Sequence, residues 1–153
     1  MSKVYANDAY AMAMQVDLSD SKGMLQKAKK KDPLQKVLFI TADAAVLPFA
    51  NDLFDVVACS HALYELKGAA RISALKEMKR VVKPGSGTVF IMEHEKPTHP
   101  LTKLLFKIRI KMVGSSDAGA FLDAGLVPFK EIFPAVNLSR SPSGKSRLLR
   151  CTK

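Results

Sequence analysis

The stretch Val37–Asp55, VLFITADAAVLPFANDLFD, decides the fold of this chain. It opens with four apolar residues in a row, the composition of a strand buried on both faces of a parallel sheet. A short polar turn leads to a second run of this kind, which begins at Phe54. Asp43 follows the first run, where ligands bind at the carboxyl ends of strands in open α/β sheets. The same acid can instead cap the following turn, and this stretch alone leaves both interpretations open.

Apolar strand runs and amphipathic helices alternate around this stretch. Such alternation predicts βαβ units and an α/β fold with a mainly parallel sheet. Two late runs separated by a turn-rich segment predict a C-terminal antiparallel hairpin. The expected strands are 11–17, 37–40, 54–59, 88–92, 129–133 and 145–152. One helix is expected between Ser19 and Asp32, and three more at 69–82, 100–113 and 118–126. Gly125 is expected to end the last of these helices.

Length and composition fit one domain over residues 1–153. The chain is 48% hydrophobic and 25% charged, which is ordinary for a globular protein. It contains no apolar run near the ~20 residues that span a bilayer, and no signal peptide is visible. Cys59 and Cys151 lie far apart without metal-like spacing, so we expect reduced thiols, a buried Cys59 and a cytoplasmic protein.

The positive charge is concentrated in the C-terminal third. The formal net charge is +10, and residues 96–153 carry 11 Lys and Arg against 3 Asp and Glu. This excess suits an anionic partner such as nucleic acid, an acidic membrane surface or an anionic substrate, although solubility alone also explains it. Nucleic acid is the least favoured partner, because the aromatic-basic interleaving of RNA-binding modules is absent.

Residues 100–113 fit both a helix and, over a shorter stretch, a strand. The helical period matches more residues, so we expect a helix. Lysines line one side of this helix. Such a basic amphipathic helix can roof a pocket, rest on a membrane surface or pack on its own domain. Its apolar face consists of Leu101, Leu104, Leu105, Ile108 and Met112.

Three segments are informative in combination: VDLSDSKGML, ITADAAVLPFANDLFDVVACS and ALKEMKRVVKPGSGTVFIMEHEKP. Together they resemble the class I S-adenosylmethionine-dependent methyltransferases. The likeness is strongest to the methyltransferase type 11 group and the ubiquinone/menaquinone-biosynthesis C-methyltransferases. It implies a Rossmann-like fold, S-adenosylmethionine as cofactor and methyl transfer to a small-molecule acceptor. The Glu93–Pro97 corner, which resembles EFSKP of the quinone enzymes, favours a lipid-like or aromatic acceptor.

The resemblance also implies roles for individual residues. Asp17 would accept hydrogen bonds from the ribose hydroxyls, and Asp43 would accept one from the adenine amino group. The Ala44 N–H would meet a ring nitrogen. The remaining cofactor contacts implied by the family are Leu18 and Leu47 beside the adenosine, and Ser60 beside the methionine portion.

His61 is the candidate base, because it follows a strand end that faces the expected site. A base is needed only when the acceptor must lose a proton. The alternative is a histidine that packs or caps, and Tyr64 is a weaker candidate. The acids and histidines at 93–99 match no standard metal spacing, so no metal is expected.

One departure from the family is large. The family begins with a strand and a Gly-rich turn that cradles the cofactor's methionine end. Here no glycine precedes Gly23, so the central strand looks missing and the domain looks N-terminally shortened. The neighbouring strands could close up, the N-terminal segment could fill the gap, or a second copy in a homodimer could supply a strand. Two further functions stay open: a non-catalytic remnant that acts as a binding or partner subunit, and a basic RNA-binding or RNA-methylating module.

Overall fold

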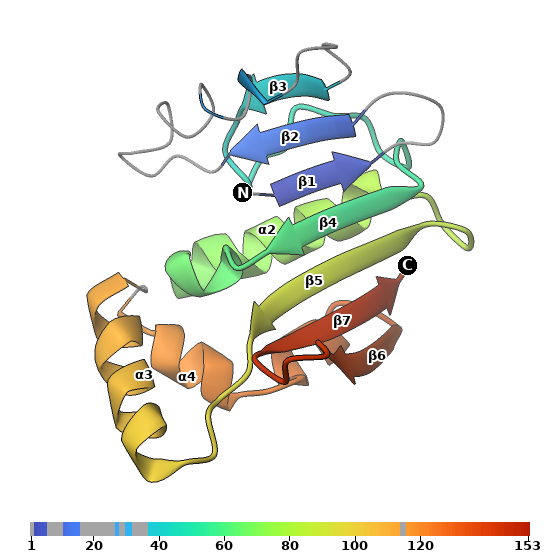
Figure 1. Cartoon of the computed structure of the whole chain (residues 1–153). Helices are drawn as coiled ribbons and strands as arrows, with labels where there is room; N and C mark the ends of the chain where they lie inside the picture. The colour runs from blue at the N-terminus through green and yellow to red at the C-terminus, as the bar shows by residue number, and fades with distance from the viewer. Residues whose placement is uncertain (1, 6–10, 16–26, 28–29, 32–36, 114–115) are drawn as a thin grey trace.

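The computed structural model describes residues 2–5, 11–15, 27, 30–31, 37–113 and 116–153. Seven strands form one sheet in the order β3-β2-β1-β4-β5-β7-β6 (Figure 1). The strands are β1 Ser2–Tyr5, β2 Ala11–Gln15, β3 Val37–Thr41, β4 Val56–Ser60, β5 Thr88–His94, β6 Ala135–Arg140 and β7 Ser146–Thr152. This sheet confirms the α/β class.

The N-terminal segment fills the central position of the sheet. β1 lies between β2 and β4 and runs antiparallel to both, with Val4 opposite Met12 on one side and Val57 on the other. A gap there would leave two rows of backbone groups unpaired in the middle of the sheet. Of the three ways to close the gap, the structure therefore shows the second, and no other copy is required for it.

The other strands keep the expected directions. β2 pairs with β3 and β4 pairs with β5 in parallel, so these four strands have their carboxyl ends at one edge. The reversed β1 and the hairpin of β6 and β7 make the sheet mixed. The predicted C-terminal antiparallel hairpin is confirmed.

The first strand of that hairpin lies later than predicted. Val127–Lys130 is a short helix, α5, and β6 begins at Ala135. Phe129 lies in α5 and Phe133 follows it, and the Phe133 N–H donates to the Phe129 carbonyl at 2.8 Å, which continues the helical turn. A spacing of four residues places two side chains on one side of a strand as well as of a helix, so the sequence pattern does not separate the two. Both are buried, and Pro128 stands at the start of the helix, where it is tolerated.

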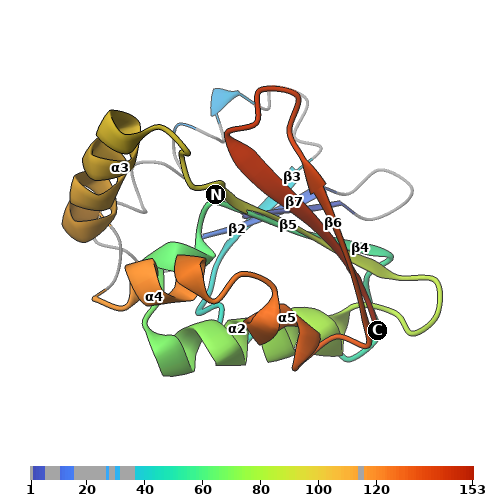
Figure 2. The same ribbon diagram turned by 90° about the horizontal axis from the view of Figure 1, so that it is seen from below.

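Helices cover one face of the sheet. α2 (Gly68–Val81), α4 (Ala118–Asp123) and α5 lie on the same side, whereas α3 (Pro100–Val113) stands at the carboxyl edge (Figure 2). The predicted helices 69–82 and 100–113 are thus confirmed, and the one predicted at 118–126 is present but ends earlier, at Asp123. Gly125 follows it with the positive φ of a helix end, 63°. A short 3-10 turn, η1 (Leu63–Glu65), precedes α2.

The core lies between α2 and the strands β4, β5 and β7. Alternate strand residues face the helix because side chains alternate across a strand. Cys59 is buried among them, as predicted, and burial raises the pKa of the Cys151 thiol to about 12, so that this thiol stays protonated at neutral pH. The core strand residues are Val57, Cys59, Val89, Ile91, Leu149 and Cys151, and those of α2 are Ala74, Leu75, Met78 and Val81.

Some predicted features lie outside the described residues. These are the helix expected between Ser19 and Asp32, apart from three isolated positions, and the cofactor contacts Asp17 and Leu18. Among the described residues, no helix has the length and apolar character to cross a membrane.

The turn between α2 and β5 requires glycine at position 87. An added Cβ would lie 2.4 Å from the Lys83 carbonyl oxygen and 2.7 Å from the Val82 side chain. We expect Gly87→Ala to lower the free energy of unfolding by about 2 kcal/mol or more, because backbone cannot move aside cheaply. Gly119→Ala on α4 is the control: nothing lies near its Cβ, so it should be neutral or stabilise by up to about 1 kcal/mol. Urea denaturation measures both, and equal effects would contradict the steric argument.

Candidate active site

Two histidines lie at the shared carboxyl edge of the sheet. His94 is the last residue of β5, and His61 follows Ser60, the last residue of β4. His61 has a φ of 50°, a left-handed conformation that is uncommon outside glycine and often found at functional sites. Its backbone N–H donates to the Met92 carbonyl at 2.7 Å, which holds this turn against β5.

The two imidazole rings stack on each other. Their centroids are 4.4 Å apart with an interplanar angle of 35°. Tyr64 lies 5.1 Å from the His94 ring, and Phe106 of α3 meets the same ring edge-on at 5.9 Å. The predicted base His61 is therefore part of an aromatic cluster built from β4, β5, η1 and α3.

Burial keeps both imidazoles neutral. Desolvation lowers the pKa of His94 to about 4, helped by the neighbouring His61 and by the positive charge of Arg109. Desolvation and Arg109 also lower the pKa of His61 from its ordinary value. His61 Nδ1 and His94 Nε2 are buried and find no hydrogen-bond partner among the described residues. Neutral rings with an available nitrogen can accept a proton, although depressed pKa values make them weak bases.

A buried acid lies on the helix-facing side of β5 next to this cluster. Glu93 is 0% exposed, and its Oε1 accepts a hydrogen bond from the Leu63 N–H at 3.0 Å. Desolvation raises the pKa of Glu93 to about 7, while the Leu63 N–H and Arg147 oppose the rise. Arg147 is the cross-strand neighbour of Glu93 and is also buried, which lowers the pKa of its guanidinium. The carboxyl group is thus half protonated near neutral pH.

The loop after β3 carries the other predicted cofactor contacts. Asp43 is exposed, and its Oδ1 accepts a hydrogen bond from the Ala45 N–H at 2.8 Å, so the carboxylate caps its own turn. Ala44 and Leu47 are buried in the core. The hydrogen bond from Ala45 does not prevent Asp43 from binding a ligand, because the exposed carboxylate has further lone pairs.

A charged pair on α2 holds this loop. Glu77 accepts a hydrogen bond from the Leu47 N–H at 2.8 Å and pairs with Arg80 at 2.7 Å. Arg80 also donates to the Phe49 and Leu47 carbonyls at 2.8 and 3.0 Å. The hydrogen bond from Arg80 lowers the pKa of Glu77, which keeps the pair ionised. The conformation after Asp43 is therefore fixed from beneath by α2.

The topology sets the separation between the two groups of predicted residues. β2 and β1 lie between β3 and β4, so Asp43 and Ser60 stand three strand spacings apart, or about 14 Å. Because β1 is reversed, its first residue Ser2 lies near the carboxyl edge between them. A strand that ends at this edge can continue through a turn into a helix at the site. β1 begins at this edge, so it supplies no such turn.

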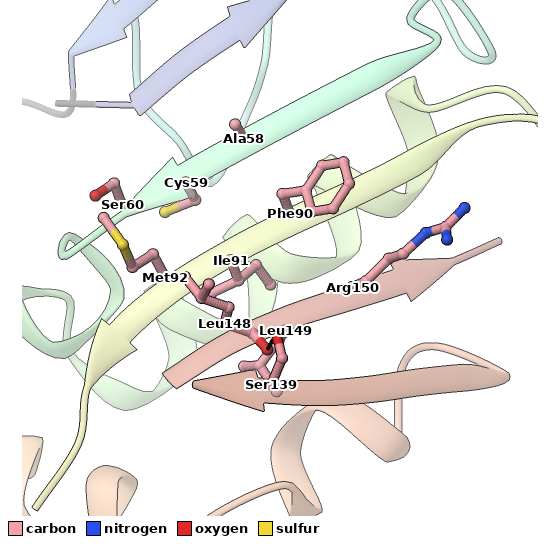
Figure 3. A pocket seen from close by; sticks show the side chains of 10 residues that line it. All are labelled: Ala58, Cys59, Ser60, Phe90, Ile91, Met92, Ser139, Leu148, Leu149 and Arg150. Atoms are coloured by element: carbon pink, nitrogen blue, oxygen red, sulfur yellow. Dashed lines mark hydrogen bonds between the residues drawn. The ribbon is translucent and has the colours of Figure 1, made fainter. Parts of the chain in front are cut away.

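A hollow of about 490 Å³ lies on the sheet face away from α2 (Figure 3). It is shallow and apolar, and it lies along β4, β5, β6 and β7 rather than at the carboxyl edge; of its lining residues, Cys59, Ile91 and Leu149 also belong to the core under the sheet. Two of its lining residues border the histidines: Ser60 directly precedes His61, and the Met92 carbonyl accepts the His61 N–H. Its other lining residues are Ala58, Cys59, Phe90, Ile91, Ser139, Leu148, Leu149 and Arg150.

Comparison with known proteins identifies the family. Residues 1–91 match the profile of the methyltransferase domain. The chain belongs to the methyltransferase domain family. Demethylmenaquinone methyltransferase of Staphylococcus epidermidis is 38% identical over 97 residues, which cover 63% of this chain. The same stretch covers 39% of that relative's length, so the chain corresponds to well under half of it.

Solved methyltransferase structures share the fold. A methyltransferase in complex with the Haloferax volcanii Trm112 methyltransferase activator superposes with a TM-score of 0.63 at 15% identity, covering 92% of this chain and 71% of that one. PigF with SAH gives a TM-score of 0.63 at 14% identity, covering 93% and 47%. These structures support the predicted Rossmann-like fold. The match to the methyltransferase domain supports the predicted cofactor, S-adenosylmethionine.

Sequence reasoning found part of the histidine cluster. Ser60 and His61 are candidates because they follow the predicted strand 54–59. His94 follows the predicted strand 88–92 in the same way, but from the sequence His94 is considered only as a possible metal ligand. Among the residues that the structure describes, no group of three or more His, Cys, Asp or Glu is gathered as metal ligands would be. The sequence contains no sign that Phe106 and Arg109 belong to this cluster, because α3 is distant from His61 along the chain and approaches the histidines only in the folded structure.

Opposing titrations of Glu93 and His94 give a testable pH dependence. Glu93 titrates near 4.5 unfolded and about 7 folded, so between these values the folded state holds a proton that the unfolded state lacks, and stability falls as pH rises. His94 titrates near 6.5 unfolded and about 4 folded, so the unfolded state takes the proton, and stability rises with pH. Between about pH 4.5 and 6.5 the two slopes oppose each other.

Single variants should separate these slopes. Relative to the wild type, Glu93→Gln should make the free energy of unfolding rise with pH, and His94→Gln should make it fall, each by up to about 1.4 kcal/mol per pH unit. Urea denaturation at several pH values between 4.5 and 6.5 measures this. Glu131→Gln, at an exposed acid, is the control and should leave the slope unchanged. A Glu93→Gln curve parallel to the wild type would show that Glu93 titrates normally.

Proposed function

We propose that this chain binds S-adenosylmethionine at the carboxyl edge of its sheet and transfers the methyl group to a small-molecule acceptor. The observation that carries this proposal is the pair of neutral, stacked imidazoles at the ends of β4 and β5 in a methyltransferase-family sheet. The methyltransferase fold by itself does not require a proton acceptor at this edge, so the two imidazoles there are evidence for a reaction and not only for the fold.

The residues divide into a binding group and a reacting group. Asp43 and the Ala44 N–H would receive the adenine, Asp17 the ribose, and Leu18, Leu47 and Ser60 would border the rest. Bound S-adenosylmethionine supplies a methyl group on a positive sulfur, so the protein's main task is to align acceptor and donor.

His61 is the proposed base. It would accept the acceptor's proton as the new bond to the methyl group forms, and His94 would hold the His61 ring by stacking. The neutrality of both rings at physiological pH supports this role.

The proposed acceptor is aromatic or lipid-like. Tyr64 and Phe106 place two aromatic side chains against His94, which gives a flat ring an apolar wall. The Staphylococcus epidermidis relative is named for demethylmenaquinone, and the Glu93–Pro97 corner resembles that of the quinone enzymes. An aromatic acceptor that loses a proton from oxygen or carbon would use a base such as His61.

A second candidate function is a non-catalytic binding subunit of the same fold. The reversed β1 favours it, because this strand brings no strand-to-helix glycine turn to the methionine end of the cofactor site. In both cases we infer weak cofactor binding, because Asp43 and Ala44 would serve the adenosine side, whereas the reversed β1 brings no glycine turn to the methionine side.

Calorimetric titration with S-adenosylmethionine tests the binding proposal. The wild-type monomer should bind weakly, with a Kd above the micromolar range, and Asp43→Ala should weaken binding by about tenfold because one charge-assisted hydrogen bond is lost. Glu131→Ala, which also removes one exposed carboxylate, should have no effect. Micromolar binding would contradict the reduced affinity. An unchanged Kd in Asp43→Ala would contradict the adenine contact and favour the second candidate.

A methylation assay tests the role of His61. The probe acceptor is a demethylmenaquinone analogue with a short side chain, and the readout is transfer of labelled methyl groups. His61→Ala should lower kcat by about 100-fold or more while cofactor binding is retained. His99→Ala is the matched control, because His99 is exposed and outside the cluster, and it should behave as the wild type. Equal rates for His61→Ala and wild type would remove His61 from the mechanism.

A further inference from the structure

The exposed apolar surface of this chain is concentrated on α3. Five large hydrophobic side chains of this helix are between 49% and 80% exposed. Elsewhere in the described residues, exposed large hydrophobics are scattered over several elements. Contiguous exposed patches of this kind mark sites of interaction, whereas single ones do not. The five residues are Leu101, Leu104, Leu105, Ile108 and Met112.

The exposed apolar face points away from the fold. At ~100° per residue, the five side chains fall within about 100° of the helix circumference. The opposite side carries Ile110, which is buried, and Phe106, which is partly buried and packs against the core. α3 stands at the corner of the molecule beside α4, so its outer face is clear of the sheet and of the other helices that the structure describes (Figures 1 and 2).

Positive charge borders this face on both sides. Lys107 and Lys111 lie on one flank and Arg109 on the other, and residues 100–113 include no acidic residue. Lys107 and Lys111 also line a hollow of about 200 Å³ between α3 and α4, together with Lys96. Lys96 pairs with Asp123. For Lys107 and Lys111 no ion pair is formed with any described residue, so their charge is available to an anionic partner.

We propose that α3 lies flat in the surface of an anionic lipid bilayer, with its apolar face in the acyl boundary and its cations at the headgroups. An amphipathic helix with an apolar face bordered by Lys and Arg binds in this manner. At 14 residues α3 is about 21 Å long, too short to cross the hydrocarbon core. A second copy is the less suitable occupant, because it would bring two cationic borders together in a chain of net charge +10.

This orientation would place the candidate active site beside the lipid. Phe106 touches His94 from the same helix whose outer face meets the bilayer, and the charge of Arg109 acts on both histidines. If the proposed function holds, an acceptor dissolved in the membrane could reach the imidazoles along α3. The membrane contact itself does not depend on methyl transfer, and its test uses no cofactor or acceptor.

Vesicle co-sedimentation of the full chain tests the proposal. The chain should bind vesicles made of equal parts phosphatidylglycerol and phosphatidylcholine, bind pure phosphatidylcholine weakly, and lose binding as salt increases. Leu105→Ser with Ile108→Ser should weaken binding by about tenfold or more. Lys107→Glu with Lys111→Glu should weaken it by more than about 30-fold, because the loss of each lysine alone costs about fivefold and each new glutamate is repelled by the anionic surface.

Matched double variants are the controls. Val127→Ser with Leu138→Ser removes two exposed hydrophobics elsewhere, and Lys76→Glu with Lys130→Glu makes the same change in net charge on other elements. Both should bind as the wild type, and circular dichroism should show all variants folded. Equal binding to both kinds of vesicle, or equal loss in the controls, would overturn the proposal. A third outcome would also overturn it: the wild type does not bind vesicles but dimerises with increasing concentration in sedimentation velocity, and the Leu105 and Ile108 substitutions abolish the dimer. The apolar face of α3 would then bind a second copy of the chain.

Discussion

The structure depends on a backbone requirement at the centre of the sheet. β2 and β4 each present a row of N–H and C=O groups toward the space between them, and leaving these unpaired would be costly. β1 satisfies both rows by running antiparallel to its neighbours. With this position filled, β4 and β5 can hold one side of the core and β2 and β3 can extend the sheet. The four residues Ser2–Tyr5 therefore join its two halves.

The direction of β1 has a chemical consequence. Parallel strands bring their ends, and the turns that follow them, to the edge where ligands bind. A reversed strand brings its beginning to that edge instead. The adenosine side of the proposed cofactor site keeps its acidic loop, which Glu77 and Arg80 hold in place. The reversed β1 brings no strand-to-helix turn to the methionine side, which is why we expect weak cofactor binding.

Burial shapes the chemistry at the same edge. Desolvation pushes His61 and His94 toward the neutral form and also pushes Glu93 toward its neutral form. The two imidazoles therefore carry little charge near neutral pH, while Arg109 and Arg147 remain as cations, the first acting on both rings and the second on Glu93. The aromatic side chains of Tyr64 and Phe106 beside these neutral rings suit an apolar acceptor. α3 supplies Phe106 and, through its opposite face, the proposed contact with lipid.

The sequence by itself determined the elements that depend on local patterns. The apolar runs at Val37 and Phe54, the period of 100–113 and the glycine at 125 predicted strands, helices and a helix end, because burial follows spacing along the chain. It also pointed to His61 through its place after a strand. It misplaced the first strand of the hairpin, since Phe129 and Phe133 fit either period over so short a stretch. Only the tertiary structure decided the course of β1, the stacking of His94 on His61 and which face of α3 stays uncovered. These depend on pairing and packing between segments far apart in sequence, and no local pattern records such contacts.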